Sequence, residues 1–497
     1  GLSIETTDIN VDILGNFTLS SSDLIVNRRI SENAVDHTVI DDQDFTYENV
    51  FTPSTMDTPG SDNGTSSVSD FGHIVLNGSE SYHAWTGPSA NVVIRFEQVT
   101  EAEAEHLVVG CGVRKPSGLS NSNLTGTFVA YGVQRGFVRA PEAFNETDLT
   151  FVERSTLAFN GTGGVSNSYN VTGFTRSIGE QHSDIGSMID HDTTETTTLQ
   201  MASPAPSVGV DPGTYSLAAD GLLSMTIDGE ASEAQLGADL NTAVFGDRDS
   251  GSILFGFAVR QGSGMTNSDV VGEYTVFDWE YCLSGAHTGG WGKDEDVMVT
   301  RAYAKLALDG TFHLRLDEWT IRRTFENIVV DNNPDEADDD DLVVMNKFTF
   351  VKSNKGPRFV NGTYTLSPNG QLNLQYTAEG ETTTIAGQVS SDGLTFVYGG
   401  TVFDNTAQKA TANFGIGVRR VGPQAPIFLN EFGMYQNGFR MRLHSEAGVP
   451  VEILSTDNLN GWGVLQSLTP AGGLTDLVDT TALNATRRFY LPVYAPW

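Results

Sequence analysis

An acidic run has the residue types and spacing that best suit a metal ion. It extends from Asp331 to Asp341 and has oxygen-bearing side chains at alternate positions, Asp331, Asn333 and Asp335. Oxygen ligands at positions one, three and five of a Ca²⁺ loop converge in this way. Glu336 stands where such a loop has glycine, and no bidentate glutamate closes the loop. We expect either a solvated acidic hairpin loop or a Ca²⁺ site formed by Asp331, Asn333, Asp335 and Asp339.

A second group of ligand-type residues lies between His182 and His191. These two histidines share the stretch with Asp184, Asp190 and Asp192, and histidine is a common metal ligand. The stretch has no apolar period, which favours a long loop. A solvated loop is the simpler interpretation, and a metal site is the alternative.

The short motifs of common catalytic sites are missing from this sequence. It has no Gly-x-Ser-x-Gly elbow, His-Glu-x-x-His pair, phosphate loop or dinucleotide fingerprint. Carboxylates are abundant, but nothing in the sequence brings two of them together as a glycosidase requires. We expect no enzymatic activity and no cofactor other than the Ca²⁺ considered above.

Carbohydrate contacts are a further hypothesis. Trp279, Trp291 and Trp319 could stack on sugars, although aromatic residues in strands more often belong to the core. Asparagines that precede x-Ser/Thr are candidates for glycosylation, and the Asn-Gly-Thr cases suit turns equally well. These asparagines are Asn16, Asn63, Asn77, Asn123, Asn145, Asn160, Asn170, Asn361 and Asn484.

The elements that position these residues are repeated β strands. Residues 256–274 nearly repeat residues 110–128, and a shortened third copy covers 414–420. In the middle copy Phe255, Phe257 and Val259 are predicted to face one way, with small residues on the other face where backbones approach closely. A Ser-Gly-x-x-Asn-Ser turn and a Gly-x-Tyr strand start follow. We interpret the repeat as duplication of a β module and not as an active site.

Recurring arginines and hairpin turns complete this pattern. Arg114, Arg260 and Arg419 occupy the same repeat position and could bind acidic loops through salt bridges. Alternating strands flank Asp-Gly or Asn-Gly pairs, which favour tight turns because glycine accepts a positive φ. These pairs are Asp220-Gly221, Asp309-Gly310, Asn369-Gly370 and Asp392-Gly393. The pattern predicts an all-β chain of tandem antiparallel meanders, either barrel-like or propeller-like.

Domain boundaries follow from changes in composition. We expect an extended strand segment over 1–30, a first β module with long loops over 31–210, and second and third repeats over 211–425. A small β-sandwich over 426–497 follows the linker at Pro423–Pro426. Residues 52–69 are rich in Ser, Thr, Gly and Asp and are expected to form surface loops.

The N-terminal strand is the candidate for assembly. Ile9, Val11 and Ile13 alternate with polar residues, and Phe17 and Leu19 resume the pattern. Such a strand has one buried face, so it pairs within its own sheet or is donated to a neighbouring subunit.

Bulk composition restricts the partners. The formal charge is −35 over 497 residues, which argues against binding to nucleic acid or anionic membranes. No stretch approaches the roughly 20 apolar residues of a membrane span. The chain starts Gly1-Leu2, and we expect that a leader has been removed or lies outside it. Cys111 and Cys282 do not form a disulfide framework, although a bond between them is an alternative.

The last 70 or so residues carry a more specific pattern. Ser455-Thr456-Asp457-x-Leu459 precedes Trp462, and Asp476 precedes Arg487-Arg488-Phe489-Tyr490. This resembles a C-terminal module common in large secreted proteins of aquatic bacteria, and the upstream repeats resemble secreted β-repeat proteins from similar sources. The resemblance implies a small Ig-like β-sandwich of the extracellular kind and no particular chemistry.

These observations favour a structural subunit of an extracellular filament or surface assembly, secreted or at the cell surface. Its partners would be identical subunits joined head-to-tail, with donation of strand 9–19 as one mechanism. The alternative is a carbohydrate-binding adhesin, with glycans as partners. A polysaccharide-active enzyme is the least favoured hypothesis.

Overall fold

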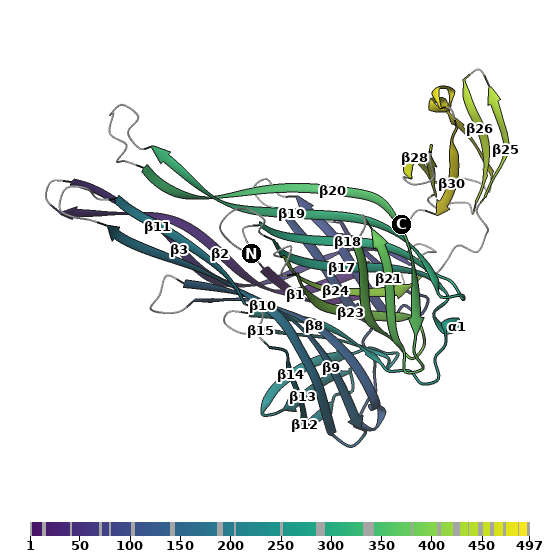
Figure 1. Ribbon diagram of the computed structural model, residues 1–497. Coiled ribbons are helices and arrows are strands. Elements are labelled where there is room, and N and C mark those ends of the chain that lie inside the picture. Colours follow the sequence, from purple (N-terminus) through teal and green to yellow (C-terminus); the bar gives the residue numbers. More distant parts are fainter. Residues whose placement is uncertain are drawn as a thin grey trace.

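The protein is described here from a computed structural model. It describes residues 2–11, 16–39, 42–68, 72–78, 81–100, 105–139, 145–185, 192–202, 205–248, 252–284, 294–331, 342–378, 381–404, 409–420, 428–435, 437–445, 451–457, 462–470, 474–485 and 487–494. Almost every element is a strand (Figure 1), so the predicted all-β class is confirmed. The short helical elements are η1 (Asn121–Asn123), α1 (Asn267–Val270) and η2 (Thr480–Asn484).

The first seven strands form one sheet in chain order, which we call the open sheet. Its end strands are β1 and β7, and each strand pairs with the next one in sequence. The strands are β1 (Leu2–Val11), β2 (Asn16–Val39), β3 (Asp42–Val68), β4 (His73–Asn77), β5 (Ser81–Thr86), β6 (Val92–Thr100) and β7 (Glu105–Val113).

The next nine strands form the first barrel. The ring closes because β16 pairs with β8 and β9 pairs with β10, while β11 extends the sheet beside the far half of β10. The strands are β8 (Thr125–Arg139), β9 (Asn145–Asn160), β10 (Gly164–Ile185), β11 (Asp192–Ala202), β12 (Ser207–Leu217), β13 (Leu222–Ile227), β14 (Glu230–Leu236), β15 (Thr242–Arg248) and β16 (Ser252–Arg260).

The second barrel is closed by eight antiparallel strands, with β24 paired to β17. Of the two arrangements predicted, barrels are therefore confirmed. The strands are β17 (Gly272–Ser284), β18 (Asp294–Leu306), β19 (Thr311–Asp331), β20 (Leu342–Leu366), β21 (Gln371–Ala378), β22 (Glu381–Val389), β23 (Thr395–Asp404) and β24 (Lys409–Arg419).

The chain ends in a C-terminal module of two three-stranded sheets, ordered β25-β26-β29 and β28-β27-β30. Leu443, Ile453 and Leu477 come from both sheets and form one small core, as the predicted sandwich requires. The strands are β25 (Phe428–Tyr435), β26 (Gly438–His444), β27 (Val451–Thr456), β28 (Gly463–Leu468), β29 (Leu474–Asp479) and β30 (Phe489–Tyr494).

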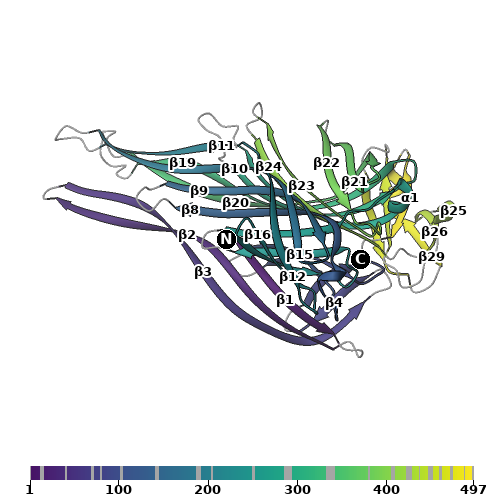
Figure 2. The same cartoon turned by 90° about the horizontal axis from the view of Figure 1, so that it is seen from below.

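Two stretches that were expected to be loops belong largely to strands. Residues 52–68 lie in β3, which pairs with β2 in continuous register from Asn16↔Thr65 to Val39↔Asp42. Residues 181–185 and 192 lie in β10 and β11. The expectation was wrong because an antiparallel ladder is bonded through the backbone, so polar side chains do not prevent it. The long hairpins β2–β3, β10–β11 and β19–β20 extend toward the same end of the molecule (Figures 1 and 2).

The tight turns were predicted correctly. Gly221, Gly310, Gly370 and Gly393 all have positive φ and lie between strands that are neighbours in a sheet. The expected boundary at 210/211 lies inside β12, a strand of the first barrel, because the hairpin at Asp220-Gly221 is in the middle of a repeat. The Gly-x-aromatic starts at Gly126 and Gly272 instead begin the two barrels.

Candidate assembly surface

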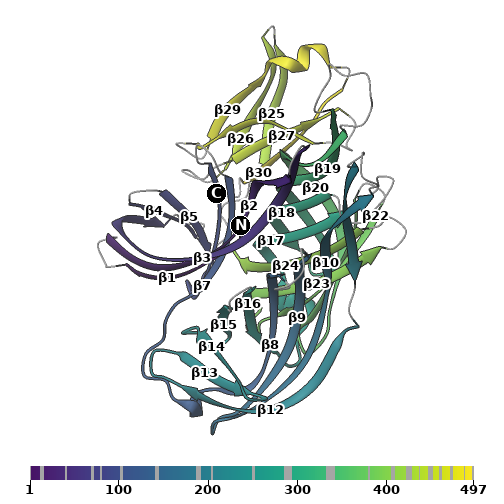
Figure 3. The same ribbon diagram turned by 90° about the vertical axis from the view of Figure 1, so that its left-hand side faces the viewer.

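The repeat strands β7, β16 and β24 are the last strands of the open sheet and of the two barrels. Figure 3 labels all three strands. Around them lies an apolar cluster, the shared core, to which all three contribute. The buried residues of the shared core are Trp85, Val92, Ile94, Val129, Tyr131, Phe257, Val259, Phe277, Val299, Val397, Phe414, Ile416 and Val418. Its position explains the repeat, because one hydrophobic face of each unit must be buried against the other two.

Each barrel's repeat strand has two different faces. Phe257 and Val259 point outward into the shared core, while Ala258 belongs to the interior core of the first barrel. Gly256 lies directly opposite Phe245, whose ring occupies the space that a Cβ would need. In the second barrel Gly417 lies opposite Phe396 in the same way. The predicted facing of the repeat is confirmed, and an aromatic ring fills the space on the glycine side.

The recurring arginines join the units through the backbone. Ala238 N donates to Arg114 O at 2.8 Å, and Ser391 N donates to Arg260 O at 2.9 Å, so each unit binds the next at the same repeat position. The side chain of Arg260 donates to Leu240 O, and that of Arg419 donates to Val271 O. Both acceptors are backbone carbonyl oxygens, so these two hydrogen bonds are not the salt bridges to acidic loops that were expected.

The third junction closes the ring of units. A Cβ on Gly87 would lie 2.9 Å from Arg419 O, so the loop before β6 is beside the end of β24. Pro88 occupies the repeat position that Ala238 and Ser391 occupy in the other two units. Proline has no N–H, so the hydrogen bond found at the other two junctions cannot form here. The open sheet, first barrel and second barrel therefore surround the shared core with approximate threefold symmetry.

Buried ions reinforce the contact between the two barrels. Arg176 of the first barrel binds Asp148 within its own sheet and Glu295 of the second barrel, the latter at 3.1 Å. The guanidinium of Arg135 lies 3.4 Å from the centre of the Tyr281 ring. Burial raises the pKa of Tyr281 above its ordinary range despite the nearby arginines. Removing one member would leave a buried charge without its partner, so this cluster fixes how the barrels dock.

A second ionic contact attaches the C-terminal module. Arg315 of β19 and Glu452 of β27 are both buried, with Nη2 2.8 Å from Oε2. Arg315 also approaches Asp317, which binds Arg301 at 3.2 Å. The guanidinium of Arg301 lies 5.2 Å from the centre of the Trp319 ring. Burial, the largest effect, lowers the pKa of Arg301 to about 10.

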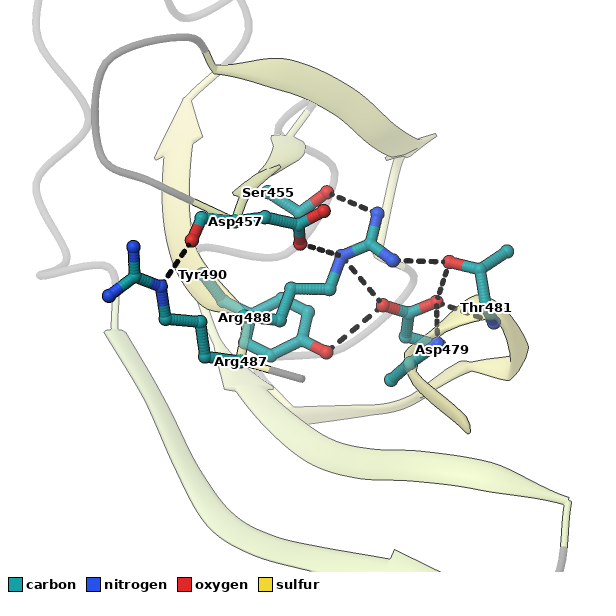
Figure 4. Close-up of polar contacts among 8 residues, drawn as sticks. Ser455, Asp457, Asp479, Thr481, Arg487, Arg488 and Tyr490 are labelled. Atoms are coloured by element: carbon teal, nitrogen blue, oxygen red, sulfur yellow. Dashed lines mark hydrogen bonds and ion pairs between the residues drawn. The ribbon is translucent and has the colours of Figure 1, made fainter. Parts of the chain in front are cut away.

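The residues behind the C-terminal resemblance meet in one polar network (Figure 4). Asp479 caps η2 by accepting from Thr481 N and Ala482 N, and it also accepts from the Tyr490 hydroxyl at 3.0 Å. Arg488 Nε lies 3.3 Å from Asp479, and Arg488 Nη2 donates to Ser455. Burial alone would raise the pKa of Asp479, but the hydrogen bonds from Thr481 and Tyr490 bring it below its ordinary value.

That network corrects one assignment and explains the motif. The aspartate at its centre is Asp479, whereas Asp476 lies on the exposed face and pairs with Arg442. The motif therefore stabilises the sandwich from within, by linking strands β27, β29 and β30.

Buried carboxyl groups in the second barrel had no signal in the sequence. Asp278 lies on the side of β17 that contributes Val276 to the barrel's interior core, and it hydrogen-bonds Tyr398. Burial, followed by the nearby Glu280, raises the pKa of Asp278 well above its ordinary range. Burial also raises the pKa of Glu280. Burial disfavours the charged form of both carboxyl groups, and the alternation of β17 alone does not show which carboxylates will be enclosed.

The open sheet differs from the barrels by one strand. In each barrel the first strand, β8 or β17, pairs with both the second strand and the last strand. In the open sheet, no described strand joins β7 to β1. Ile9 is 47% exposed, whereas Leu157 and Ala304 at the equivalent register positions are 9% and 2% exposed. A Cβ on Gly112 would meet nothing within 4 Å, unlike one on its equivalent Gly417. Over the described residues, the open sheet therefore has no strand that corresponds to β8 or β17.

The predicted assembly strand is located at this opening. Ile9 and Val11 lie in β1, paired with Leu19 and Phe17 of β2 within the same sheet. Phe17 is buried and contacts Leu76, and Ile13 lies outside the described residues. In the single chain β1 pairs with β2, and donation of this segment to a neighbouring subunit stays a prediction.

Most of the remaining candidate residues fall outside what the structure describes. Asn333, Asp335, Asp339, Asp190, His191 and Trp291 lie outside the described residues, as do the side chains of Asp331, His182, Asp184 and Asp192. Within the described ranges no group of three or more His, Cys, Asp or Glu residues is placed to hold a metal ion. Trp279 and Trp319 pack against the shared core. Cys111 and Cys282 are not bonded to each other.

The sequons occupy varied positions. Asn160 forms the expected turn, where its side chain accepts from Thr162 N and Gly164 N. Asn63 and Asn361, the other Asn-Gly-Thr cases, lie within strands β3 and β20. Exposed side chains belong to Asn63, Asn77, Asn123, Asn160, Asn170 and Asn361, whereas those of Asn16, Asn145 and Asn484 are outside the description.

Among the described residues, no helix has the length and apolar character needed to cross a bilayer.

Comparison with known proteins gives no family. No family model matches the chain, and no curated protein matches its sequence. Similar solved structures include a tryptophan-to-alanine variant of the vaccine antigen transferrin binding protein B from Haemophilus parasuis Hp5. It has 7% identity and a TM-score of 0.21, with 67% of this chain and 83% of that chain covered. Isotype 1 transferrin binding protein B from serogroup B Neisseria meningitidis has 9% identity and a TM-score of 0.13, with 69% and 85% covered. The similarity is distant.

Proposed function

We propose that this protein is a structural subunit of an extracellular filament or surface assembly and that it self-associates through the open sheet. The observation that carries the proposal is the open edge between β1 and β7, which no described strand joins, whereas the equivalent positions of both barrels are filled. An unpaired strand edge is a template for another chain. Here the edge strand β1 has 10 residues, and the apolar side chain of Ile9 in it is 47% exposed.

The rest of the molecule suits a rigid building unit. The shared core and the Arg176–Asp148–Glu295 cluster hold the open sheet and the barrels together. The Arg315–Glu452 pair adds the C-terminal module. An interface on such a body does not lose orientation through motion between domains, so repeated contacts can build a regular assembly.

The acidic composition supports an extracellular location and predicts how assembly depends on salt. With a formal charge of −35, subunits repel each other at low ionic strength. Screening at about 0.15 M salt shortens that repulsion to about 8 Å, while a strand-to-strand contact is unaffected. Assembly should therefore increase with salt.

The test is a single charge at the open edge. Wild-type protein and the Ile9→Lys variant are compared by sedimentation velocity and electron microscopy over a concentration series. Lysine at this inward-facing edge position opposes strand addition, as inward charges do in natural edge strands. The concentration needed for assembly should rise by about tenfold or more, which corresponds to the loss of about 1.4 kcal/mol.

A matched control uses Val208→Lys, at a residue that is 70% exposed in β12, a strand of the first barrel and not of the open sheet. It should assemble like the wild type. Wild-type protein that stays monomeric throughout the series would refute the proposal. Point substitution is better than deletion of residues 1–20, because that segment contains all of β1 and the buried Phe17.

A further inference from the structure

Two histidines touch each other where the open sheet meets the second barrel. Nε2 of His73 in β4 lies 3.1 Å from Nδ1 of His83 in β5, which is hydrogen-bonding distance. His73 is directly opposite Trp85 in the β4–β5 ladder, and the centres of these two rings are 5.0 Å apart. His83 is exposed, His73 is half-buried and Trp85 is buried. The three rings therefore lead from solvent to the shared core.

Trp85 connects this pair to the second barrel. The centre of its ring is 5.4 Å from that of Phe277 in β17. The guanidinium carbon of Arg301 in β18 lies 5.9 Å from the Trp85 ring centre. A change at the histidines is therefore next to the side chain with which the open sheet contacts this barrel.

The charged groups around His73 oppose a proton there. Burial, the largest cause, and then the positive charges of His83 and Arg301 lower the pKa of His73 from 6.5 to about 4. Neighbouring β3 pairs with β4 through residues 65–68, which carry no charge, and β17 supplies the uncharged Phe277. The described charged groups that Arg301 brings to this contact are Asp317 and Arg315 of β19 and Glu452 of β27.

The same contact lacks a hydrogen bond that the other junctions have. Backbone N–H groups donate to Arg114 O and Arg260 O at those two junctions, whereas Pro88 at the third has no N–H. The barrels also have no histidine in the cross-strand pair two residues before the junction turn. Their pairs are Leu222 with Gln235 and Gln371 with Gln388.

We propose that the contact of β4 and β5 with the second barrel is an acid-sensitive joint, which opens in favour of a protonated His73 and exposes the shared core. This regulation does not depend on the proposed assembly function. Because the folded pKa of His73 is below the unfolded value, its contribution to stability is fully present above about pH 6.5 and is lost as pH falls toward about 4. A fully buried histidine would favour the opened state by about tenfold for each pH unit in that range. His73 is only half-buried, so we expect about tenfold in total between about pH 7.5 and 5.

Thiol labelling measures the opening. Val418 is buried in the shared core, and a Cβ on Gly87 of the open sheet would lie 2.9 Å from its Cγ1. Val418→Cys keeps a small apolar side chain at this joint. The variant is treated with a pyridyl disulfide, which reacts with thiols in acid, and each rate is divided by that of the denatured protein at the same pH. Mass spectrometry should show the ratio at position 418 rising about tenfold from about pH 7.5 to 5, with no rise at Cys282, which is buried in β17.

Histidine variants of the Val418→Cys protein identify the titrating group. His73→Gln should remove most of the rise. His83→Gln should reduce it, because the charge of His83 then no longer opposes protonation of His73 in the closed state. His313→Gln is the matched control: His313 is an exposed histidine of β19 that contacts Asn361, and its replacement should leave the rise unchanged.

Three results would overturn the proposal. An equal rise at position 418 and at Cys282 would mean that acid unfolds the second barrel as a whole. A rise that persists in full in both His73→Gln and His83→Gln would assign it to another group. No rise between about pH 7.5 and 5 in the parent Val418→Cys protein would show that the joint stays closed in acid.

Discussion

Replacing Phe257 with alanine tests whether the shared core holds the three units together. Phe257 is fully buried, and its ring lies outside the first barrel among residues from all three units. A buried phenylalanine removes about 200 Å² from water. At about 25 cal/mol per Å² this area corresponds to about 5 kcal/mol. Since the surroundings collapse in part, Phe257→Ala should cost about 3–5 kcal/mol.

Hydrogen exchange followed by mass spectrometry is the appropriate assay, because a chain of several domains has no single free energy of unfolding. In Phe257→Ala, exchange should accelerate in β6 and β7 of the open sheet, in β8 and β16, and in β23 and β24. Phe312→Ala is the matched control: this residue is equally buried, but it belongs to the interior core of the second barrel. Its effect should stay in β17–β24.

Two outcomes bear on the reasoning. If Phe257→Ala accelerates exchange in the first barrel alone, the shared core does not couple the units and our account of the repeat is wrong. Phe257→Leu retains most of the volume and should cost only about 1 kcal/mol with a weaker version of the same pattern.

Four further predictions concern individual sites. Asp479→Asn should accelerate hydrogen exchange in β27, β29 and β30 and leave the barrels unchanged. Because the folded pKa of Asp479 is low, its contribution to stability is present above the unfolded pKa and is lost as pH falls through the folded pKa. The exchange rates of variant and wild type should therefore converge in acid. Asp278 has the opposite sign, because its raised folded pKa makes the second barrel less stable as pH rises above the unfolded pKa of about 3.9. The gain in melting temperature from Asp278→Asn should therefore grow as pH rises above that value, and a difference that stays constant with pH would refute the raised pKa. Glu452→Ala should release the C-terminal module, because it leaves Arg315 buried without this partner at a cost of about 3–5 kcal/mol. Small-angle scattering should then detect independent motion of residues 428–494. A maleimide should leave Cys111 and Cys282 unmodified at about pH 8 until the protein is denatured. The reason is that burial raises the pKa of both thiols, that of Cys282 to about 11. Rapid labelling of the native protein would contradict this prediction.

Much of the local structure could be predicted from the sequence. Asp220-Gly221, Asp309-Gly310, Asn369-Gly370 and Asp392-Gly393 all form the expected turns, because a tight hairpin needs positive φ and glycine adopts it without strain. The alternation around Phe257 also gave the correct facing of its strand. The polar strands of β2, β3, β10 and β11 were missed because their pairing is carried by backbone hydrogen bonds, which leave no apolar period to detect.

The candidate site was harder to infer. The N-terminal alternation made Ile9 a candidate assembly residue, but whether its strand would donate or accept depends on how many strands each unit contains. Asp278 and Glu280 could not be distinguished from the many exposed carboxylates, because their burial arises only when the second barrel closes around them. For the C-terminal motif, the choice between Asp476 and Asp479 depended on which one meets Arg488 across the sandwich.

The sequence by itself determined the all-β class, the turns and the existence of a repeated unit, since these depend on φ preferences and on alternation along a strand. Only the tertiary structure decided that two of the units are closed barrels, that all three units share one core, and that no described strand joins β7 to β1. Those features depend on contacts between residues more than a hundred positions apart, such as Trp85 with Phe277 and Arg176 with Glu295. A pattern along the chain can show that a face will be buried, but the partner that buries it is fixed only when distant strands meet.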